Sequence, residues 1–449
     1  MMTIAVVWWA YLRTGRTPGE LMDYADVRME GHPSVQAVLQ PIENYLREKL
    51  AAPTAQQRAR QPFIVPPPPP RRGPADVAAP ERVPAGAKVW RVGQQGALSR
   101  IAEAAALAKD GDVVEIEAGD YHGDVALWEQ KRLTIRGVNG AARLFADGRS
   151  TEGKATWVIR DGDFDISNVD FIGSKVDDGN GAGIRFEGGN LRLRNCLFWG
   201  NQMGLVTSDV ATRAQATLLV EGSEFAYSHV DGRWGHNLYV GLIDQLTVTG
   251  SYFHHAGVGH LLKSRARINH ILYNRLTDES GGRASYEVEF PNGGSARLIG
   301  NVIEQQRATE NSVIVSFGAE SYKWPVNQLI MGNNTLVNDV PFGGTFVRAA
   351  IGADSVVISN NLLVGQGGLQ VDGAAQLYNN PRVEWDAFAV PSRHDYRLRN
   401  PSGELAWRAL GEKELDTQLT PRAQYQHPRQ LLPLHDLPMW VGADQRTVP

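Results

Sequence analysis

A short phrase of small polar residues that ends in a large apolar residue recurs about every 27 residues through the middle of the chain. Two typical copies are Asn168-Val-Asp-Phe171 and Asn195-Cys-Leu-Phe198. A sequence period of about 20 to 50 residues is typical of a solenoid, in which each repeat buries its apolar face by stacking on its neighbours. The apolar residues that close the copies are Phe171, Phe198, Phe225, Phe253, Leu276, Ile303, Leu336 and Leu363.

Between these phrases lie short runs in which apolar and polar residues alternate. Leu191–Arg194, Leu246–Thr249 and Tyr286–Phe290 are examples. A period of two indicates half-buried strands, and the glycines and asparagines between the runs favour turns with positive φ. The pattern predicts an all-β, right-handed parallel β-helix over about residues 110–400, within a domain that covers residues 87–400.

Asparagine occupies the second polar position of the phrase in its last four copies. These residues are Asn274, Asn301, Asn334 and Asn361. Asparagines stacked at a corner can hydrogen-bond along the axis of a solenoid. We therefore predict a buried ladder with a structural role.

Composition and net charge limit the kinds of molecule that the protein is expected to bind. The chain has 449 residues, of which 42% are hydrophobic, and a net charge of −4. Because the charge is nearly balanced and no Lys/Arg run is interleaved with aromatic residues, nucleic acid is not expected to be a partner. The single cysteine, Cys196, excludes an internal disulfide, and its place in a repeat phrase favours buried packing over reactivity.

Residues 1–16 contain a short apolar run, Ile4–Leu12, that is followed by Arg13 and Arg16. The run is shorter than the roughly 20 residues that span a bilayer. Three interpretations are open: a truncated membrane anchor, an interfacial aromatic anchor, or a packed strand.

The next two segments predict a helix and a spacer. In residues 17–50, Thr17-Pro18 fits the start of a helix, and residues 51–86 are rich in proline, with five consecutive prolines from Pro66 to Pro70. A semi-rigid stalk beside an apolar run predicts membrane association through the N-terminus. It also predicts a periplasmic or extracellular location, with the N-terminal segment anchored in the inner membrane.

The beginning of the domain carries a family resemblance. Leu98–Lys109 has helical spacing and is followed by Gly111-Asp-Val-Val-Glu-Ile-Glu117 and Ala118-Gly-Asp-Tyr-His122. This arrangement resembles the start of the pectate-lyase-like right-handed β-helices, in which a short helix caps the first coil. The resemblance implies a capped solenoid. After about residue 400 the repeats stop, and residues 401–449 are predicted to pack back on the solenoid, ending at Val441–Asp444.

Three consecutive coils carry a concentration of polar residues. If the alternating apolar residues point inwards, the others form one outer patch. That predicted patch contains Tyr239, Lys263, Arg265, Glu287 and Glu289, and Ser316 and Arg348 extend it. His236, Asn237 and Trp234 precede the patch, and we expect them to bind substrate together with Glu287, Glu289 and Arg348.

Such a patch suits β-elimination on a uronic-acid polysaccharide, which is the leading functional hypothesis. The reaction needs a base for the C5 proton, a cation for the carboxylate and a proton donor for the leaving oxygen. Lys263 is the candidate base, Arg265 the neutralising cation, and Tyr239 or His260 the proton donor. No cofactor is required, although a Ca²⁺ held by Glu287 and Glu289 is an alternative neutralising group.

The segment Gly259-His-Leu-Leu-Lys-Ser264 is similar to alginate-lyase and chondroitinase-B-type β-helix lyases. The resemblance implies that Lys263 occupies the position of the catalytic lysine of these families. Their catalytic arginine, one coil later, falls on Glu289, and the acidic calcium ligands that precede the lysine fall on Ala256 and Val258.

Other interpretations stay open. Glu287 and Glu289 could instead serve a glycoside hydrolase as paired carboxylates. The protein could also be a non-catalytic glycan-binding or envelope scaffold protein, with a polysaccharide as its ligand. His236, His254, His255 and His260 raise the question of a metal site, but adjacent histidines on one strand face opposite sides. Trp234 could stack on a sugar ring or cover the core.

Overall fold

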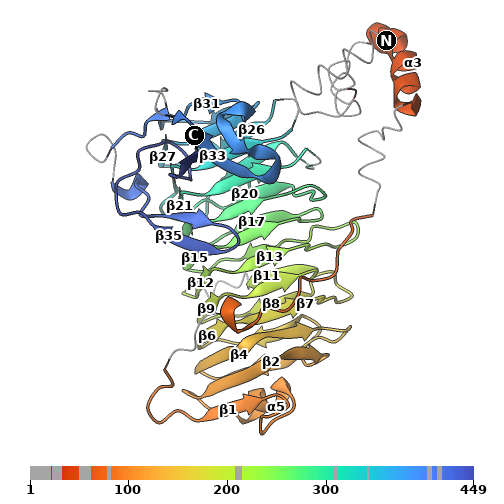
Figure 1. Cartoon of the computed structure of the whole chain (residues 1–449), viewed down its shortest axis with the longest axis vertical. Helices are drawn as coiled ribbons and strands as arrows, with labels where there is room; N and C mark the ends of the chain where they lie inside the picture. The colour runs from red at the N-terminus through yellow and green to blue at the C-terminus, as the bar shows by residue number, and fades with distance from the viewer. Residues whose placement is uncertain are drawn as a thin grey trace.

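The computed structural model places residues 22, 33–49, 62–77, 82–207, 215–307, 309, 311–340, 343–401, 407–411 and 417–448 well enough to describe. Parallel strands in these ranges stack into an elongated β-solenoid (Figure 1). The fold class predicted from the repeat is therefore confirmed as a parallel β-solenoid.

Over residues 155–383, each coil contributes one strand to each of three sides. On the first side, each strand pairs in parallel with the equivalent strand of the next coil, so the strands follow one another in chain order. Its strands are β1 (Val89–Val92), β2 (Val113–His122), β4 (Arg132–Phe145), β6 (Asp163–Ser167), β9 (Asn190–Arg194), β12 (Thr217–Glu221), β15 (Gln245–Thr249), β18 (Ile268–Leu272), β21 (Ser295–Ile299), β24 (Gln328–Gly332), β27 (Ser355–Ser359) and β30 (Ala375–Tyr378).

The second side carries the ends of the repeat phrases. It joins the first side in one 21-stranded sheet, because β4 pairs with strands of both sides. Its strands are β7 (Val169–Ile172), β10 (Leu197–Trp199), β13 (Glu224–Ala226), β16 (Tyr252–His254), β19 (Arg275–Thr277), β22 (Val302–Gln305), β25 (Thr335–Asn338), β28 (Leu362–Gly365) and β31 (Arg382–Val383).

The third side is a separate ten-stranded parallel sheet. It bears the polar patch predicted from the sequence. Its strands are β3 (Ala126–Trp128), β5 (Ala155–Ile159), β8 (Ala182–Phe186), β11 (Met203–Thr207), β14 (Leu238–Val240), β17 (His260–Ser264), β20 (Tyr286–Phe290), β23 (Val313–Phe317), β26 (Thr345–Ala349) and β29 (Gly368–Val371).

The repeat phrase builds the corner between the first two sides and the stack beside it. Its first residue takes a left-handed conformation, for example Asn195 at φ 52° and Gly222 at φ 53°, which explains the preference for Asn and Gly there. Its last residue points inwards. The rings of Phe171, Phe198 and Phe225 are stacked with centroids 5.0 and 4.4 Å apart, and each such aromatic pair adds about 0.5–1.5 kcal/mol beyond area burial.

The asparagine ladder is confirmed. The Asn301 side-chain oxygen accepts hydrogen bonds from the backbone and side-chain N–H groups of Asn274, at 2.9 and 3.1 Å. Asn334 accepts in the same way from Asn301, and Asn361 from Asn334. All four residues are fully buried, so the ladder satisfies backbone groups that the corner would otherwise leave without partners.

A short helix covers the end of the solenoid next to β1, as the sequence predicted (Figure 1). Helix α5 (Ile101–Leu107) buries Ile101 and Ala104 against the core. Asp124 accepts hydrogen bonds from the backbone N–H groups of Ile101 and Ala102, at 2.6 and 3.1 Å, and so caps the start of the helix.

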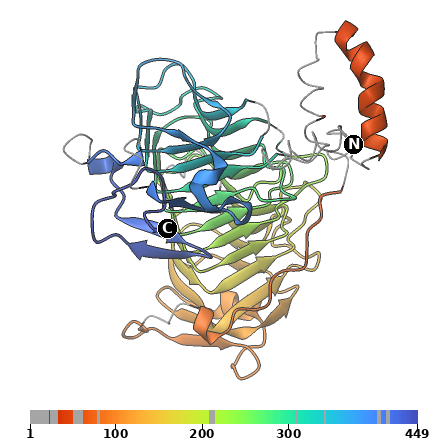
Figure 2. The ribbon, with the colours of Figure 1, turned by 45° about the horizontal axis from the view of Figure 1, so that its top comes forward.

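The described part of the tail packs back along the solenoid (Figure 2). Strand β33 (Asp395–Arg399) pairs antiparallel with β32 (Phe388–Val390) and parallel with β36 (Thr447–Val448). Val441 is fully buried, and the Gly442 N–H donates to Asn360 O at 2.8 Å. The other tail elements are η3 (Trp385–Ala387), η4 (Pro391–Arg393), η7 (Thr417–Leu419), β34 (Ala423–Gln426) and β35 (Gln430–Pro433).

Before the solenoid, α3 (Pro33–Lys49) lies within the helical segment predicted for residues 17–50, while Thr17-Pro18 lies outside the described residues. The prediction of a free stalk does not hold for residues 62–77, which lie against the solenoid and include η1 (Pro74–Asp76) (Figure 1). The interaction has a physical cause: the Trp199 indole N–H donates to Pro66 O at 2.9 Å, and Arg72 pairs with buried Asp170.

Candidate functional site

Adjacent strands of the third side bring the main candidate residues into one row. Tyr239 of β14 is in register with Lys263 of β17, and Lys263 with Glu289 of β20. Equivalent residues on neighbouring strands lie about 4.8 Å apart, so long polar side chains on this row make direct contact. The row continues through Ser316 of β23 to Arg348 of β26.

Lys263 is held between two carboxylates. Its Nζ lies 2.9 Å from Glu289 Oε2 and 3.1 Å from Glu320 Oε1. Only about a tenth of the Lys263 side chain is exposed, whereas nearly half of Glu320 is. The sequence suggested cationic and aromatic neighbours for Lys263, and it did not suggest Glu320.

Arg265 links the row to the loop after β23. Its Nε donates to the Tyr239 hydroxyl oxygen at 3.1 Å, and one terminal nitrogen lies 2.5 Å from Asn292 Oδ1 and 2.7 Å from Glu320 Oε2. The Arg265 carbonyl accepts from the Trp324 indole N–H at 3.1 Å. The guanidinium is therefore fixed on both sides, and its carboxylate partner is again Glu320.

Two histidines flank the row. His260 Nδ1 lies 3.1 Å from Glu289 Oε2, and the His260 backbone N–H donates to His236 Nδ1 at 2.9 Å. Because His236 Nδ1 accepts this hydrogen bond, the neutral imidazole carries its proton on Nε2. Burial lowers the pKa of His236 well below its ordinary value, and the neighbouring cations lower it further.

Both carboxylates of the cluster are held in the charged form. Burial raises the pKa of Glu289, but the hydrogen bond and charge of His260, together with the Lys263 ammonium, lower it below the ordinary value. Burial likewise opposes ionisation of Glu320, yet Arg265 and Lys263 bring its pKa down to about 2. Neither glutamate is therefore suited to act as a general acid at neutral pH.

An open pocket of about 870 Å³ lies against this cluster. His236, Tyr239, Lys263 and Arg265 line one part of it. Another part is formed by His229, Val230 and residues 232–234, and the Trp234 side chain is 61% exposed. A pocket lined by both an exposed indole and cationic groups suits a ligand that has an apolar ring face and a negative charge.

The sequence predicted Glu287 on the outer face beside Glu289, and this prediction is wrong. It is fully buried, and neither carboxylate oxygen has a hydrogen-bond partner among the described residues. Burial raises its pKa well above the ordinary value, and the nearby Asp278 and Glu304 raise it further. Glu289 instead contacts the outer cations. The strict alternation assumed from the sequence fails within β20, so the two glutamates do not form a shared calcium site or a catalytic pair on the outer face.

Two further candidates lie apart from the pocket lining. Asn237 is fully buried, and its amide donates to Phe225 O and His254 O at 3.1 and 2.9 Å, so it acts as a corner residue of the solenoid. Arg348 lies two coils beyond Glu289 and reaches Gln370 at 3.4 Å.

Glu320 could not have been found from the strand pattern. It lies in the loop between β23 and β24, where no alternation assigns a direction. Asn292 occupies an equally irregular position after β20. The available signal was chemical: two adjacent cations on one face, Lys263 and Arg265, call for an acidic partner.

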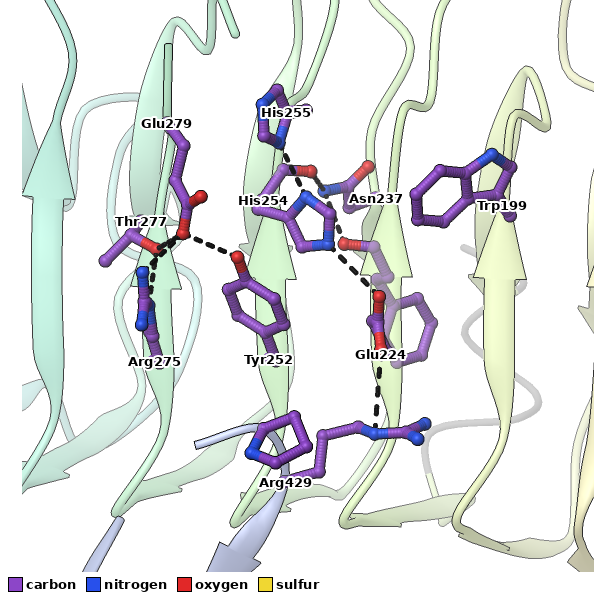
Figure 3. A network of polar contacts seen from close by, with 12 residues as sticks. Trp199, Glu224, Asn237, Tyr252, His254, His255, Arg275, Thr277, Glu279 and Arg429 are labelled. Carbon is purple, nitrogen blue, oxygen red and sulfur yellow. Dashed lines mark hydrogen bonds and ion pairs between the residues drawn. The ribbon is translucent and has the colours of Figure 1, made fainter. Parts of the chain in front are cut away.

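His254 and His255 belong to a different network, on the second side of the solenoid (Figure 3). His254 Nε2 lies 3.3 Å from Glu224, and His254 Nδ1 lies 2.6 Å from His255 Nδ1. Tyr252, on the same strand as His254, donates to Glu279 at 2.5 Å, and Arg275 of the next coil donates to the same carboxylate at 2.5 Å. The C-terminal tail covers this network, because Arg429 from the tail lies 3.6 Å from Glu224. Among the described residues, no group of three or more His, Cys, Asp or Glu side chains is arranged to hold a metal ion.

No model of a known protein family matches the sequence, and no curated protein is similar to it. Within the described ranges, no helix combines the length and the apolar character needed to cross a membrane. The apolar run Ile4–Leu12 lies outside those ranges.

Proposed function

We propose that this protein acts on an anionic polysaccharide, as a lyase that cleaves uronate-containing chains by β-elimination. The observation that carries the proposal is the convergence of Lys263, Arg265 and Tyr239 at the wall of an open pocket that the exposed Trp234 also lines. The pectate-lyase-like resemblance of residues 98–122 agrees with this proposal.

The contact between Glu320 and the two cations suggests how a uronate would bind. A single carboxylate is held here by Lys263 Nζ at 3.1 Å and by Arg265 at 2.7 Å. A substrate carboxylate that replaced the Glu320 side chain would meet the same two donors. Neutralising the carboxylate makes the neighbouring C5 proton easier to remove.

Tyr239 is the proposed proton carrier. As the phenolate, stabilised by the Arg265 N–H, it takes the C5 proton. The C4–O4 bond then breaks as the C4–C5 double bond forms, and the phenol returns its proton to O4. Lys263 fits the base role less well than the sequence suggested, because its nitrogen lies between two carboxylate oxygens. The proposal assigns it to substrate carboxylate binding.

The test is a screen of alginate, pectate, glycosaminoglycans and bacterial exopolysaccharides, in which the unsaturated product is followed by its ultraviolet absorbance. We expect activity on at least one of these polymers, and we expect its loss in Tyr239→Phe. Products with new reducing ends but no chromophore would indicate a hydrolase. Retention of glycan without turnover would indicate the glycan-binding alternative, and either result would overturn the lyase proposal.

A periplasmic or extracellular location, with association to the inner membrane through the N-terminal segment, belongs to the same proposal. Its support is the sequence alone: the apolar Ile4–Leu12 run, with Trp8-Trp9, and the occurrence of polymeric glycans outside the cytoplasm. Fractionation of cells that express the chain with and without residues 1–16 tests it. Recovery of both forms in the soluble cytoplasm would refute it.

A further inference from the structure

The proline-rich segment lies against the solenoid by one part of its surface. In residues 62–72, the partly buried positions are Phe63, Pro66, Pro68, Pro69 and Arg72, while Ile64 is 77% exposed. A polyproline II helix has three residues per turn, so Phe63, Pro66, Pro69 and Arg72 would share one of its faces. The spacing indicates that this segment is bound by one face, as proline-rich ligands are bound in aromatic grooves.

The second side of the solenoid supplies the contacts with this segment. The Trp199 indole N–H donates to Pro66 O at 2.9 Å, and a Cβ at Gly200 would come within 2.8 Å of Val65. At the far end, Arg72 donates to Asn195 O at 2.7 Å and pairs with Asp170. Figure 1 shows the orange-red segment running along the side of the solenoid towards the coils that carry the pocket.

The end nearest the pocket is Phe63. Its ring centroid lies 4.8 Å from that of His229 and 6.3 Å from that of Tyr227. His229 also lines the pocket, and its Nε2 lies 2.9 Å from Asp231 at the start of the loop that carries Trp234. A Cβ at Gly257 would meet His229 Nδ1 at 2.2 Å, so the imidazole lies directly on that backbone.

The loop itself has few other attachments. Val230 and Arg233 form an isolated bridge, and one terminal nitrogen of Arg233 donates to Asp178 O at 2.7 Å. Asp231 is fully exposed, and Trp234 is largely exposed. A loop with so little buried surface depends on the ring at its base for its position.

We propose that the proline-rich segment stabilises one side of the pocket. In this proposal, Phe63 packs against His229 and thereby positions the loop that carries Trp234. The segment is thus a bound polyproline II ligand in cis rather than a spacer. Its contribution to glycan binding rests on the proposed function, whereas its effect on the loop does not.

The experiment compares Phe63→Ala with wild type in the full chain and uses Ile64→Ala as the matched control. Hydrogen exchange of the peptide that covers residues 229–236 is the first readout, and tryptic cleavage after Arg233 is the second. We expect Phe63→Ala to speed loop exchange by about tenfold, the equivalent of losing one aromatic pair, and to increase cleavage. Ile64→Ala should match wild type.

A second variant tests the contact between the solenoid and the proline-rich segment from the side of the solenoid. Trp199→Phe keeps an aromatic ring but removes the N–H that binds Pro66 O, and it should move both readouts in the same direction as Phe63→Ala. Unchanged exchange and cleavage in both variants would overturn the inference. If the loop responds but no glycan is bound or cleaved by any form, the proposed function fails while the structural coupling stands.

Discussion

Lys263 Nζ lies 2.9 Å from Glu289 Oε2, and the two residues are in register on neighbouring coils of the third side. Only 10% of the Lys263 side chain and 4% of the Glu289 side chain are exposed. The pair is therefore a buried ion pair, and the removal of one partner leaves the other charge without full compensation.

From this geometry we predict that Lys263→Ala lowers the free energy of unfolding by about 3 kcal/mol, a typical cost for breaking a buried pair. Thermal and denaturant unfolding provide the measurement. The control is Lys131→Ala, which removes an exposed pair with Asp161 and should leave stability unchanged. Equal stability of Lys263→Ala and wild type would show that other groups compensate the buried negative charge of Glu289 when the lysine is absent.

The sequence predicted the solenoid well because its signal is repeated in every coil. Stacked residues such as Phe198 and Asn301 must match their neighbours in shape and hydrogen bonding, so one period appears at many positions. The capping helix was also found, since it is a short pattern next to the repeats.

The candidate site was found only in part, for a local reason. Strand alternation placed Tyr239, Lys263 and Glu289 correctly on one outer row. It failed for Glu287 because two successive residues of β20, Glu287 and Val288, are both fully buried. It could not find Glu320, since a loop has no periodicity from which a direction can be read.

The Asn ladder leads to a second prediction. Asn301→Ala should lower the free energy of unfolding by about 3 kcal/mol or more, because several buried polar groups lose their partner at once. Among them are Ile271 O, which accepts from Asn301 at 2.7 Å, and the backbone N–H of Asn274. Asn190→Ala is the control: its amide binds Asp163 on the exposed surface, and a change within about 0.5 kcal/mol is expected.

Glu320 gives a third prediction, on ligand affinity. If it occupies the position of the substrate carboxylate, Glu320→Gln should bind oligouronates about tenfold more tightly, since one competing hydrogen-bonded charge worth roughly 1.5 kcal/mol is removed. Titration at fixed ionic strength measures the effect. The matched control is Glu129→Gln, which neutralises an exposed carboxylate paired with Arg160. Weaker binding by Glu320→Gln would instead place Glu320 among the groups that hold the substrate.

Trp234 gives a fourth prediction. Trp234→Ala should weaken glycan binding by about tenfold, the cost of one aromatic stacking contact, whereas Trp234→Phe should retain most of the affinity. The fold should be unaffected because the indole is 61% exposed. Ile351→Ala, at an exposed apolar position away from the pocket lining, is the control. Unchanged affinity in Trp234→Ala would remove this loop from the binding site.

The buried Glu287 gives the last prediction, on the pH dependence of stability. Its pKa is raised in the folded state by burial and by the nearby Asp278 and Glu304, so the folded protein binds this proton more tightly than the unfolded chain does. The stabilisation that results is complete below the ordinary carboxyl pKa and is lost as the pH rises towards the folded value. Glu287→Leu should therefore be more stable than wild type, by a margin that grows as the pH is raised from 5 to 8. Both of these pH values lie above the ordinary glutamate pKa of about 4.3.

Leucine is a suitable replacement, because the equivalent positions in the neighbouring coils are Leu261 and Ile314, both fully buried. Denaturant unfolding across this pH range measures the margin, and Glu129→Leu at an exposed site should show no such trend. A margin that stays constant with pH would mean that Glu287 ionises as easily in the folded protein as in the unfolded chain.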